Sequence, residues 1–226
     1  MAQAESTCWT LIQAAAAGGA GDREQFARCY GPVLRAYLAS RWRSSPHLGE
    51  LDDVVQEVFV ECFKQAGVLE RAEPGRVGGF RPFLYGVVRN VALRFEAQRG
   101  RRREQQPDSL DLDGVPDAEA TLSRVFDRAW ARALLREAAS VQEQQARQAG
   151  EAACRRVELL RLRFHEGLPI REIARRWGTA AEVLHHEYAR ARQEFKAALR
   201  EVVAFHHPDS PEEVEQECAN LLARLS

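Results

Sequence analysis

Apolar residues recur every three or four positions over most of the chain, which is the spacing of amphipathic helices. No stretch alternates between apolar and polar residues as a half-buried strand would. The clearest apolar stripe consists of Phe80, Phe83, Leu84, Val87, Val88, Val91 and Phe95. The pattern therefore predicts an all-α protein.

The predicted helices fall into two domains. Residues 1–104 contain four amphipathic segments and are predicted to form a four-helix domain. Residues 105–118 are polar, contain two prolines and four aspartates, and are predicted to form an acidic linker. Residues 119–205 form the second helical domain. Residues 206–226 add a C-terminal helix, whose apolar stripe we expect to pack back on the second domain.

The third helix of the first domain is predicted to carry an acidic ridge, formed by Asp53, Gln56, Glu57 and Glu61. Acids spaced by four residues lie on one helical face and could in principle hold a metal ion. However, no histidine lies in or beside this helix, and no second carboxylate pair matches it. We therefore interpret the ridge as solvated acids available to a partner, with no metal bound.

The fourth helix is predicted to carry a basic face. The segment from Arg76 to Arg103 contains eight arginines against Glu96 alone. The polar side of the helix carries Arg81, Tyr85, Arg89, Asn90 and Arg94. Guanidinium groups bind phosphate, and aromatic rings set among them can stack on unpaired bases. A solvated basic face is the alternative, but the near absence of acids in this segment favours nucleic acid as the partner.

Residues 169–188 have the spacing of a helix-turn-helix. Ala174 is a small residue where two helices would cross, Gly178 suits the turn, and Leu184 would anchor the second helix. Many helix pairs share this spacing, so it indicates DNA binding without establishing it. The adjacent histidine pairs at 185–186 and 206–207 point to different helix faces, so neither predicts a metal site.

The composition is that of an ordinary globular protein of 226 residues, long enough for two small domains. Lys and Arg number 32 and Asp and Glu 33, so the net charge of -1 conceals separate acidic and basic segments. The five widely spaced cysteines include no C-x-x-C pair, which argues against disulfides and zinc and predicts reduced core residues. No apolar run approaches the ~18 residues of a membrane span, which favours a cytoplasmic protein without a membrane partner.

In their order and spacing, these motifs resemble the extracytoplasmic-function sigma factors of bacterial RNA polymerase. DDVVQEVF at residues 52–59 resembles the core-binding helix of the family. FRPFL through RNVAL at residues 80–93 resembles its promoter-melting, minus-ten-reading helix, and ELLRLRF through RAR at residues 158–192 resembles its minus-thirty-five-reading domain. FDRAW at residues 126–130 and the closing helix resemble a subgroup with a C-terminal extension.

The resemblance implies a sigma region 2-like domain, a region 4-like helix-turn-helix domain, and no catalytic residue, cofactor or small-molecule substrate. Core RNA polymerase would bind Asp52, Asp53, Gln56, Glu57 and Glu61. Melted promoter DNA would bind Arg76, Arg81, Tyr85, Arg89, Asn90, Arg94, Arg99 and Arg101. Duplex DNA would bind Thr179, Ala181, Glu182, His185, His186, Glu187 and Arg190. An anti-sigma protein is a further candidate partner.

The sequence departs from the family at two places. Arg94 stands where many relatives have an acidic residue, and His185, His186 and Glu187 replace a Lys-Ser-Arg-like triplet. Glu187 could accept a hydrogen bond from cytosine N4, repel phosphate, or form a local pair with Arg190. The alternative function is a free-standing helix-turn-helix regulator whose first domain senses a ligand or partner.

Overall fold

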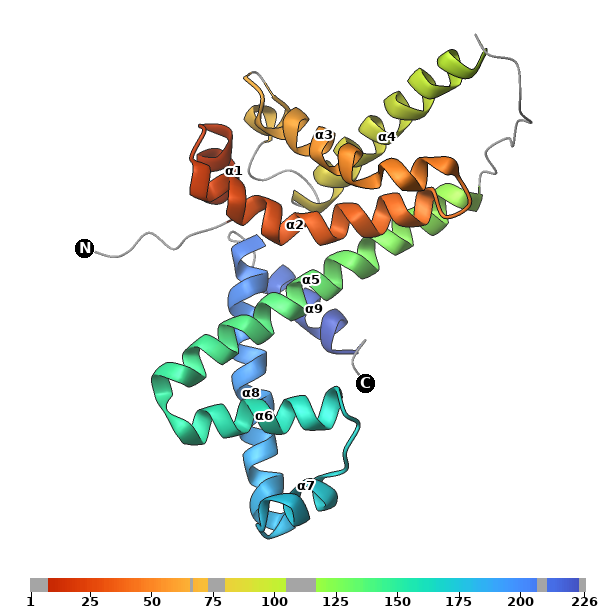
Figure 1. Ribbon diagram of the computed structural model, residues 1–226. Helices are drawn as coiled ribbons and strands as arrows, with labels where there is room; N and C mark the ends of the chain where they lie inside the picture. The colour runs from red at the N-terminus through yellow and green to blue at the C-terminus, as the bar shows by residue number, and fades with distance from the viewer. Residues whose placement is uncertain (1–7, 66, 73–79, 105–116, 207–210, 224–226) are drawn as a thin grey trace. The chain divides into compact units, whose positions relative to one another are not determined.

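The computed structural model describes residues 8–65, 67–72, 80–104, 117–206 and 211–223, and every regular element in those ranges is helical (Figure 1). The prediction of an all-α fold is confirmed. The side chains at 101–104 and 117–119 and at positions 8 and 223 lie outside the description, as does the expected linker at 105–116. The chain divides into two compact units, Met1–Ala133 and Leu134–Ser226, called unit 1 and unit 2 below.

Unit 1 contains four helices, two short 3-10 helices and the start of a fifth helix. They are α1 (Cys8–Ala16), α2 (Ala20–Arg41), η1 (Pro46–Glu50), α3 (Leu51–Phe63), η2 (Val68–Arg71), α4 (Phe80–Glu104) and the first half of α5 (Asp117–Ala149). Phe26, Tyr30 and Phe80 are at most 2% exposed, and their rings lie 4.6–5.9 Å apart, between centroids. Aromatic packing of this kind contributes beyond simple area burial, so α2 and α4 are firmly joined.

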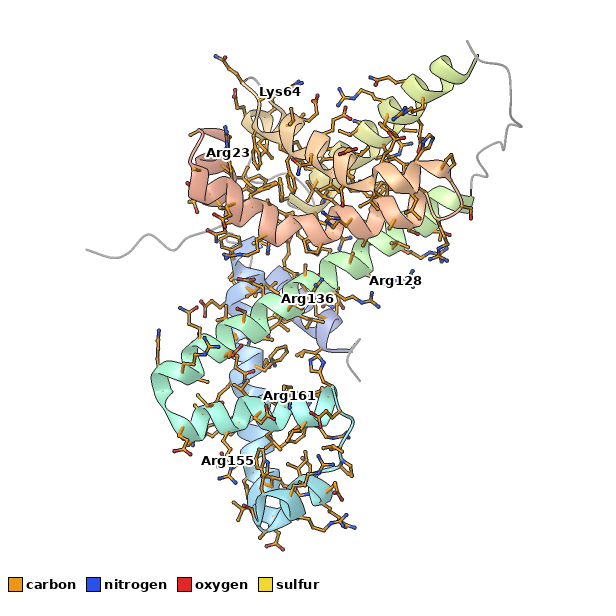
Figure 2. All side chains as sticks on the ribbon, viewed as in Figure 1. Arg23, Lys64, Arg128, Arg136, Arg155 and Arg161 are labelled. Atoms are coloured by element: carbon orange, nitrogen blue, oxygen red, sulfur yellow. The ribbon has the colours of Figure 1, made fainter. Side chains whose placement is uncertain are left out.

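Arg23 ties together the ends of two helices in unit 1 (Figure 2). Its Nε donates a hydrogen bond to the carbonyl of Ala15 at 3.0 Å, and its Nη2 donates to the carbonyl of Phe63 at 3.1 Å. Carbonyls in the last turn of a helix lack intrahelical donors. One cation therefore caps both α1 and α3, which fixes where the acidic helix α3 ends.

The first half of α5 packs within unit 1. Phe126 and Trp130 are 1% and 5% exposed, and Trp130 stacks on Tyr30 of α2 at 5.5 Å. The compact units consequently divide after Ala133, whereas the sequence places the start of the second domain at residue 119. The apolar stripe of α5 is visible in the sequence, but the surface that it covers is not.

Unit 2 contains the second half of α5 together with α6 (Glu151–Phe164), α7 (Ile170–Trp177), α8 (Ala181–His206) and α9 (Pro211–Ala223). Gly150 has a φ of 101°, in the left-handed region that glycine tolerates, and it joins α5 to α6. On α5, the buried Gln142 donates to the carbonyl of Ala191 on α8 at 3.0 Å.

The C-terminal helix α9 packs on α8, as the sequence predicts. Val214, Cys218 and Leu221 are buried, and Arg200 of α8 pairs with Glu215 at 2.6 Å. Burial raises the pKa of the Cys218 thiol. The apolar stripe of α9 is therefore covered by α8.

Candidate functional site

The acidic ridge predicted on the third helix lies on the solvent side of α3. Asp52, Asp53 and Gln56 are exposed and Glu57 is half-buried. Asp52 forms an ion pair with Arg35 of α2. The side chains of Asp53, Gln56 and Glu57 form no hydrogen bond or ion pair with the part of the chain that the structure describes. Asp53 and Glu57 therefore present carboxylates that have no partner in that part of the chain.

A groove runs between α2 and α3 beside the ridge. Apolar groups from Pro32, Val55 and Phe59 contribute to its lining, and Arg28 and Arg35 line it from α2. The groove thus offers apolar surface and the side chains of Arg28 and Arg35 next to Gln56 of the ridge.

Glu61 is turned away from the ridge. It accepts a hydrogen bond from Lys64 at 2.9 Å and lies 3.3 Å from Nη2 of Arg94 on α4. The hydrogen bond from Lys64, with the charge of Arg94, lowers the pKa of Glu61. Glu61 therefore joins α3 to α4, and Arg94 stands where it neutralises an acid of the neighbouring helix.

The basic face of α4 has more acid partners than the sequence suggests. Arg81 Nε lies 3.3 Å from Asp127 Oδ1 of α5, and Arg99 pairs with Glu50 of η1. With the pair between Glu61 and Arg94, three of the predicted DNA-binding arginines have a carboxylate from another helix. The near absence of acids holds for the segment itself but not for the surface around it.

Other predicted DNA-binding residues on α4 vary in exposure. Asn90 is exposed, and Arg89 and Tyr85 are half-buried. The ring of Tyr85 packs edge-on against Tyr37 at 5.6 Å and against Phe126 at 5.3 Å. Tyr85 is thus engaged in intramolecular packing. Arg76 lies outside the described residues, as does the side chain of Arg101.

Glu96, the acid within the basic segment, belongs to a clamp between α2 and α4. It accepts hydrogen bonds from Nε and Nη2 of Arg41 at 2.7 and 2.9 Å and from Nε1 of Trp42 at 2.7 Å. Burial acts to raise the pKa of Glu96, but these hydrogen bonds outweigh it, so the pKa lies below its ordinary value. Glu96 is therefore held by Arg41 and Trp42, and it does not pair with the described arginines of the basic face.

The helix-turn-helix geometry predicted for residues 169–188 is present in unit 2. Gly178 ends α7 with a φ of 61°, Ala174 is 4% exposed and Leu184 is 3% exposed. Both residues belong to a cluster with Leu159, Leu162, Ile170 and Ile173. The second helix of the pair, α8, is held against α7 and α6 through this cluster.

Most residues predicted to contact duplex DNA lie on the outer side of α8. Glu182, His185, His186 and Arg190 are exposed, and Thr179 and Ala181 are half-buried. Glu187 differs, because its carboxylate accepts a hydrogen bond from Nη1 of Arg156 on α6 at 3.3 Å. The structure therefore presents most of the predicted set together and directs Glu187 toward α6.

Several residues that shape these surfaces have no distinguishing signal in the sequence. Arg28 and Arg35 line the groove beside the ridge, Asp127 holds Arg81, and Arg156 holds Glu187. Arg156 has a side chain only 8% exposed. The alternation of charge along each helix gives no signal for such pairs, because each joins two different helices.

Two absences hold for the described part of the chain. No group of three or more metal-ligating side chains comes together there, and none of its helices is both long and apolar enough to span a bilayer. In the same part of the chain, five large apolar side chains are exposed, among them Val60 on α3, Leu93 on α4 and Val183 on α8.

Comparison with known families identifies the central part of unit 1. Residues 26–103 match the family Sigma-70 region 2, which indicates a sigma factor involved in RNA polymerase binding and promoter recognition. The match includes α3, α4 and most of α2, so the ridge, the groove and the basic face lie within it. Searches of curated proteins and of solved structures found no match.

Proposed function

We propose that the protein is an RNA polymerase sigma factor of the extracytoplasmic-function type, which binds core polymerase and directs promoter recognition, melting and initiation. The observation that carries the proposal is the Sigma-70 region 2 match over residues 26–103, a range that includes both α3 with the acidic ridge and α4 with the basic face. Such a protein has no catalytic residues and acts in the cytoplasm with the polymerase.

In this proposal, the solvent side of α3 docks on core polymerase. Asp53, Gln56 and Glu57 are not engaged within the described chain, and the groove beside them supplies apolar contacts. Interface charges orient and steer a partner, whereas desolvated apolar surface supplies most of the affinity. We infer that the partner surface is cationic opposite the ridge and apolar opposite the groove.

The DNA contacts divide between the units. Arg89, Asn90 and Arg94 of α4 hold the melted strand, and α8 of the helix-turn-helix holds duplex upstream. In helix-turn-helix motifs, residues near the N-terminus of the second helix contact the base edges. The early part of α8 presents Glu182, His185 and His186 and no lysine or arginine, so we expect most phosphate attraction to come from unit 1.

The closing helix α9 supports the assignment to a subgroup with a C-terminal extension. Because its apolar side is covered by α8, the extension belongs to unit 2, and its exposed residues include Glu212, Glu213 and Glu215. An anti-sigma protein remains a candidate partner.

The experiment is gel filtration of the full chain mixed with bacterial core RNA polymerase. Co-elution in a stable complex is the expected result. Separate elution, together with sequence-specific duplex binding by the free chain, would instead favour the helix-turn-helix regulator.

A further inference from the structure

The first half of α5 lies on a surface formed by α2 and α4, and we propose that it is a latch that must open before Arg81 and Tyr85 can bind single-stranded DNA. The latch consists of Phe126, Asp127 and Trp130. This inference rests on the proposed function, because it concerns the same α4 surface. It gives a role to the FDRAW motif, which docking and promoter reading leave unexplained.

The polar part of the latch is the pair between Arg81 and Asp127. Arg81 Nε lies 3.3 Å from Asp127 Oδ1, and the two side chains are 42% and 32% exposed. A carboxylate and a phosphate use the same donors of a guanidinium group. Asp127 therefore competes directly with a DNA phosphate for Arg81.

The aromatic part of the latch covers Tyr85. Phe126 is 1% exposed and its ring lies 5.3 Å from that of Tyr85 at an angle of 75°. A base that stacks on an aromatic side chain needs a free ring face. While Phe126 and Tyr37 pack against Tyr85, that ring remains half-buried and engaged.

The contacts are of a kind that can open. The ion pair is partly exposed to solvent, and exposed pairs contribute little to stability. α5 is also absent from the helix pairs of unit 1 whose backbones approach closely, so large side chains make the contact. The apolar contact extends from Phe126 to Trp130, which stacks on Tyr30 at an interplanar angle of 18°.

The first test measures binding of a fluorescein-labelled, mixed-sequence single-stranded oligonucleotide by the full chain. Asp127→Asn should release Arg81 and tighten binding by up to about fivefold, the equivalent of an exposed ion pair. Its salt slope should steepen by about 0.7, the value for one added phosphate contact on a single strand. Glu137→Gln is the matched control, because Glu137 is exposed on the same helix and its loss changes the net charge equally.

The double variant Arg81→Ala/Asp127→Asn decides whether the gain passes through Arg81. The latch predicts that the gain of Asp127→Asn disappears when Arg81 is absent. A gain no larger than that of Glu137→Gln, or one that persists without Arg81, would overturn the proposal.

Hydrogen exchange of residues 120–133 tests the opening itself. Saturating oligonucleotide should accelerate exchange in this segment of the wild-type chain while α2 stays protected. Trp130→Phe, which keeps an aromatic ring at this position but weakens the stacking on Tyr30, should show part of this acceleration without DNA. Unchanged exchange in DNA-bound wild type would overturn the latch.

These outcomes separate the latch from the proposed function. A chain that binds core polymerase and initiates, but shows no coupling between Asp127 and Arg81, has the function without the latch. A chain that shows the coupling but never associates with core polymerase has the latch without the function.

Discussion

Arg156 of α6 is shared between two acids of α8, and its bond to Glu187 removes that residue from the set free to face DNA. Arg156 Nη1 donates to Glu187 Oε2 at 3.3 Å, and Nε donates to Glu194 at 2.9 and 3.0 Å. These hydrogen bonds, chiefly those to Glu194, raise the pKa of Arg156. The local pair between Glu187 and Arg190 does not form, because Arg190 lies 3.6 Å from Glu194 instead.

We predict that the two acids differ in their effect on stability. Glu194→Gln should lower the free energy of unfolding by about 1 to 2 kcal/mol, because Arg156 is buried and loses its main acceptor. Glu187→Gln should cost less than about 1 kcal/mol, because Glu187 is 41% exposed. Urea unfolding checks both. Equal costs would contradict the assignment of Glu194 as the principal partner.

Glu187→Arg gives a sharper version of this prediction. A second guanidinium beside Arg156 would repel it, so the variant should be less stable than Glu187→Gln. If the Glu187 side chain instead contacted only DNA and not Arg156, the same substitution would leave the stability of the fold unchanged and tighten duplex binding.

The docking role of α3 predicts the effect of reversing two charges. Asp53→Lys with Glu57→Lys should abolish association with core polymerase, because both carboxylates are free of partners within the described chain. The helical circular dichroism should remain. Glu24→Lys with Glu137→Lys is the control, since it makes the same change in net charge at two other exposed acids. Wild-type co-elution of the first variant would remove the docking role.

The basic face predicts a change in salt dependence. Replacing Arg89 and Arg94 with Ala should weaken binding of a single-stranded oligonucleotide and reduce the log-log salt slope by about 0.7 for each lost phosphate contact. Arg94 must exchange Glu61 for phosphate when it binds the strand. Arg128→Ala with Arg136→Ala on α5, labelled in Figure 2, is the charge-matched control. An unchanged slope would show that this face does not meet the backbone.

The clamp around Glu96 predicts a pH dependence. A carboxyl whose pKa is lower in the folded than in the unfolded chain stabilises the fold above the unfolded value and loses this contribution as the pH falls. Glu96→Gln should therefore cost about 1 to 2 kcal/mol at pH 7. The difference from wild type should shrink below about pH 4.5, the ordinary pKa of the group. A difference independent of pH between 7 and 3 would show that the charge of Glu96 is unimportant.

Local patterns in the sequence predict most of the fold. The spacing from Phe80 to Phe95 corresponds to α4, the acidic segment to α3, and the Ala174–Gly178–Leu184 spacing to the turn between α7 and α8. Each of these features depends on residues close together in the chain. Helical periodicity and turn residues are therefore sufficient to find them.

Pairings between distant residues could not be predicted in the same way. Arg99 and Glu50 are 49 residues apart, and Arg156 and Glu187 are 31 apart. The choice of partner depends on how the helices pack, which a single sequence does not specify. For the same reason, the sequence indicates neither the acids that surround the basic face nor the packing of the first half of α5 within unit 1.

The most direct test of the central claim is reconstituted transcription with core RNA polymerase, the full chain and bacterial DNA fragments. The account predicts transcripts from discrete start sites that require the chain and that disappear with Asp53→Lys/Glu57→Lys. Initiation no different from that of core polymerase alone, at chain concentrations that saturate the polymerase, would contradict it.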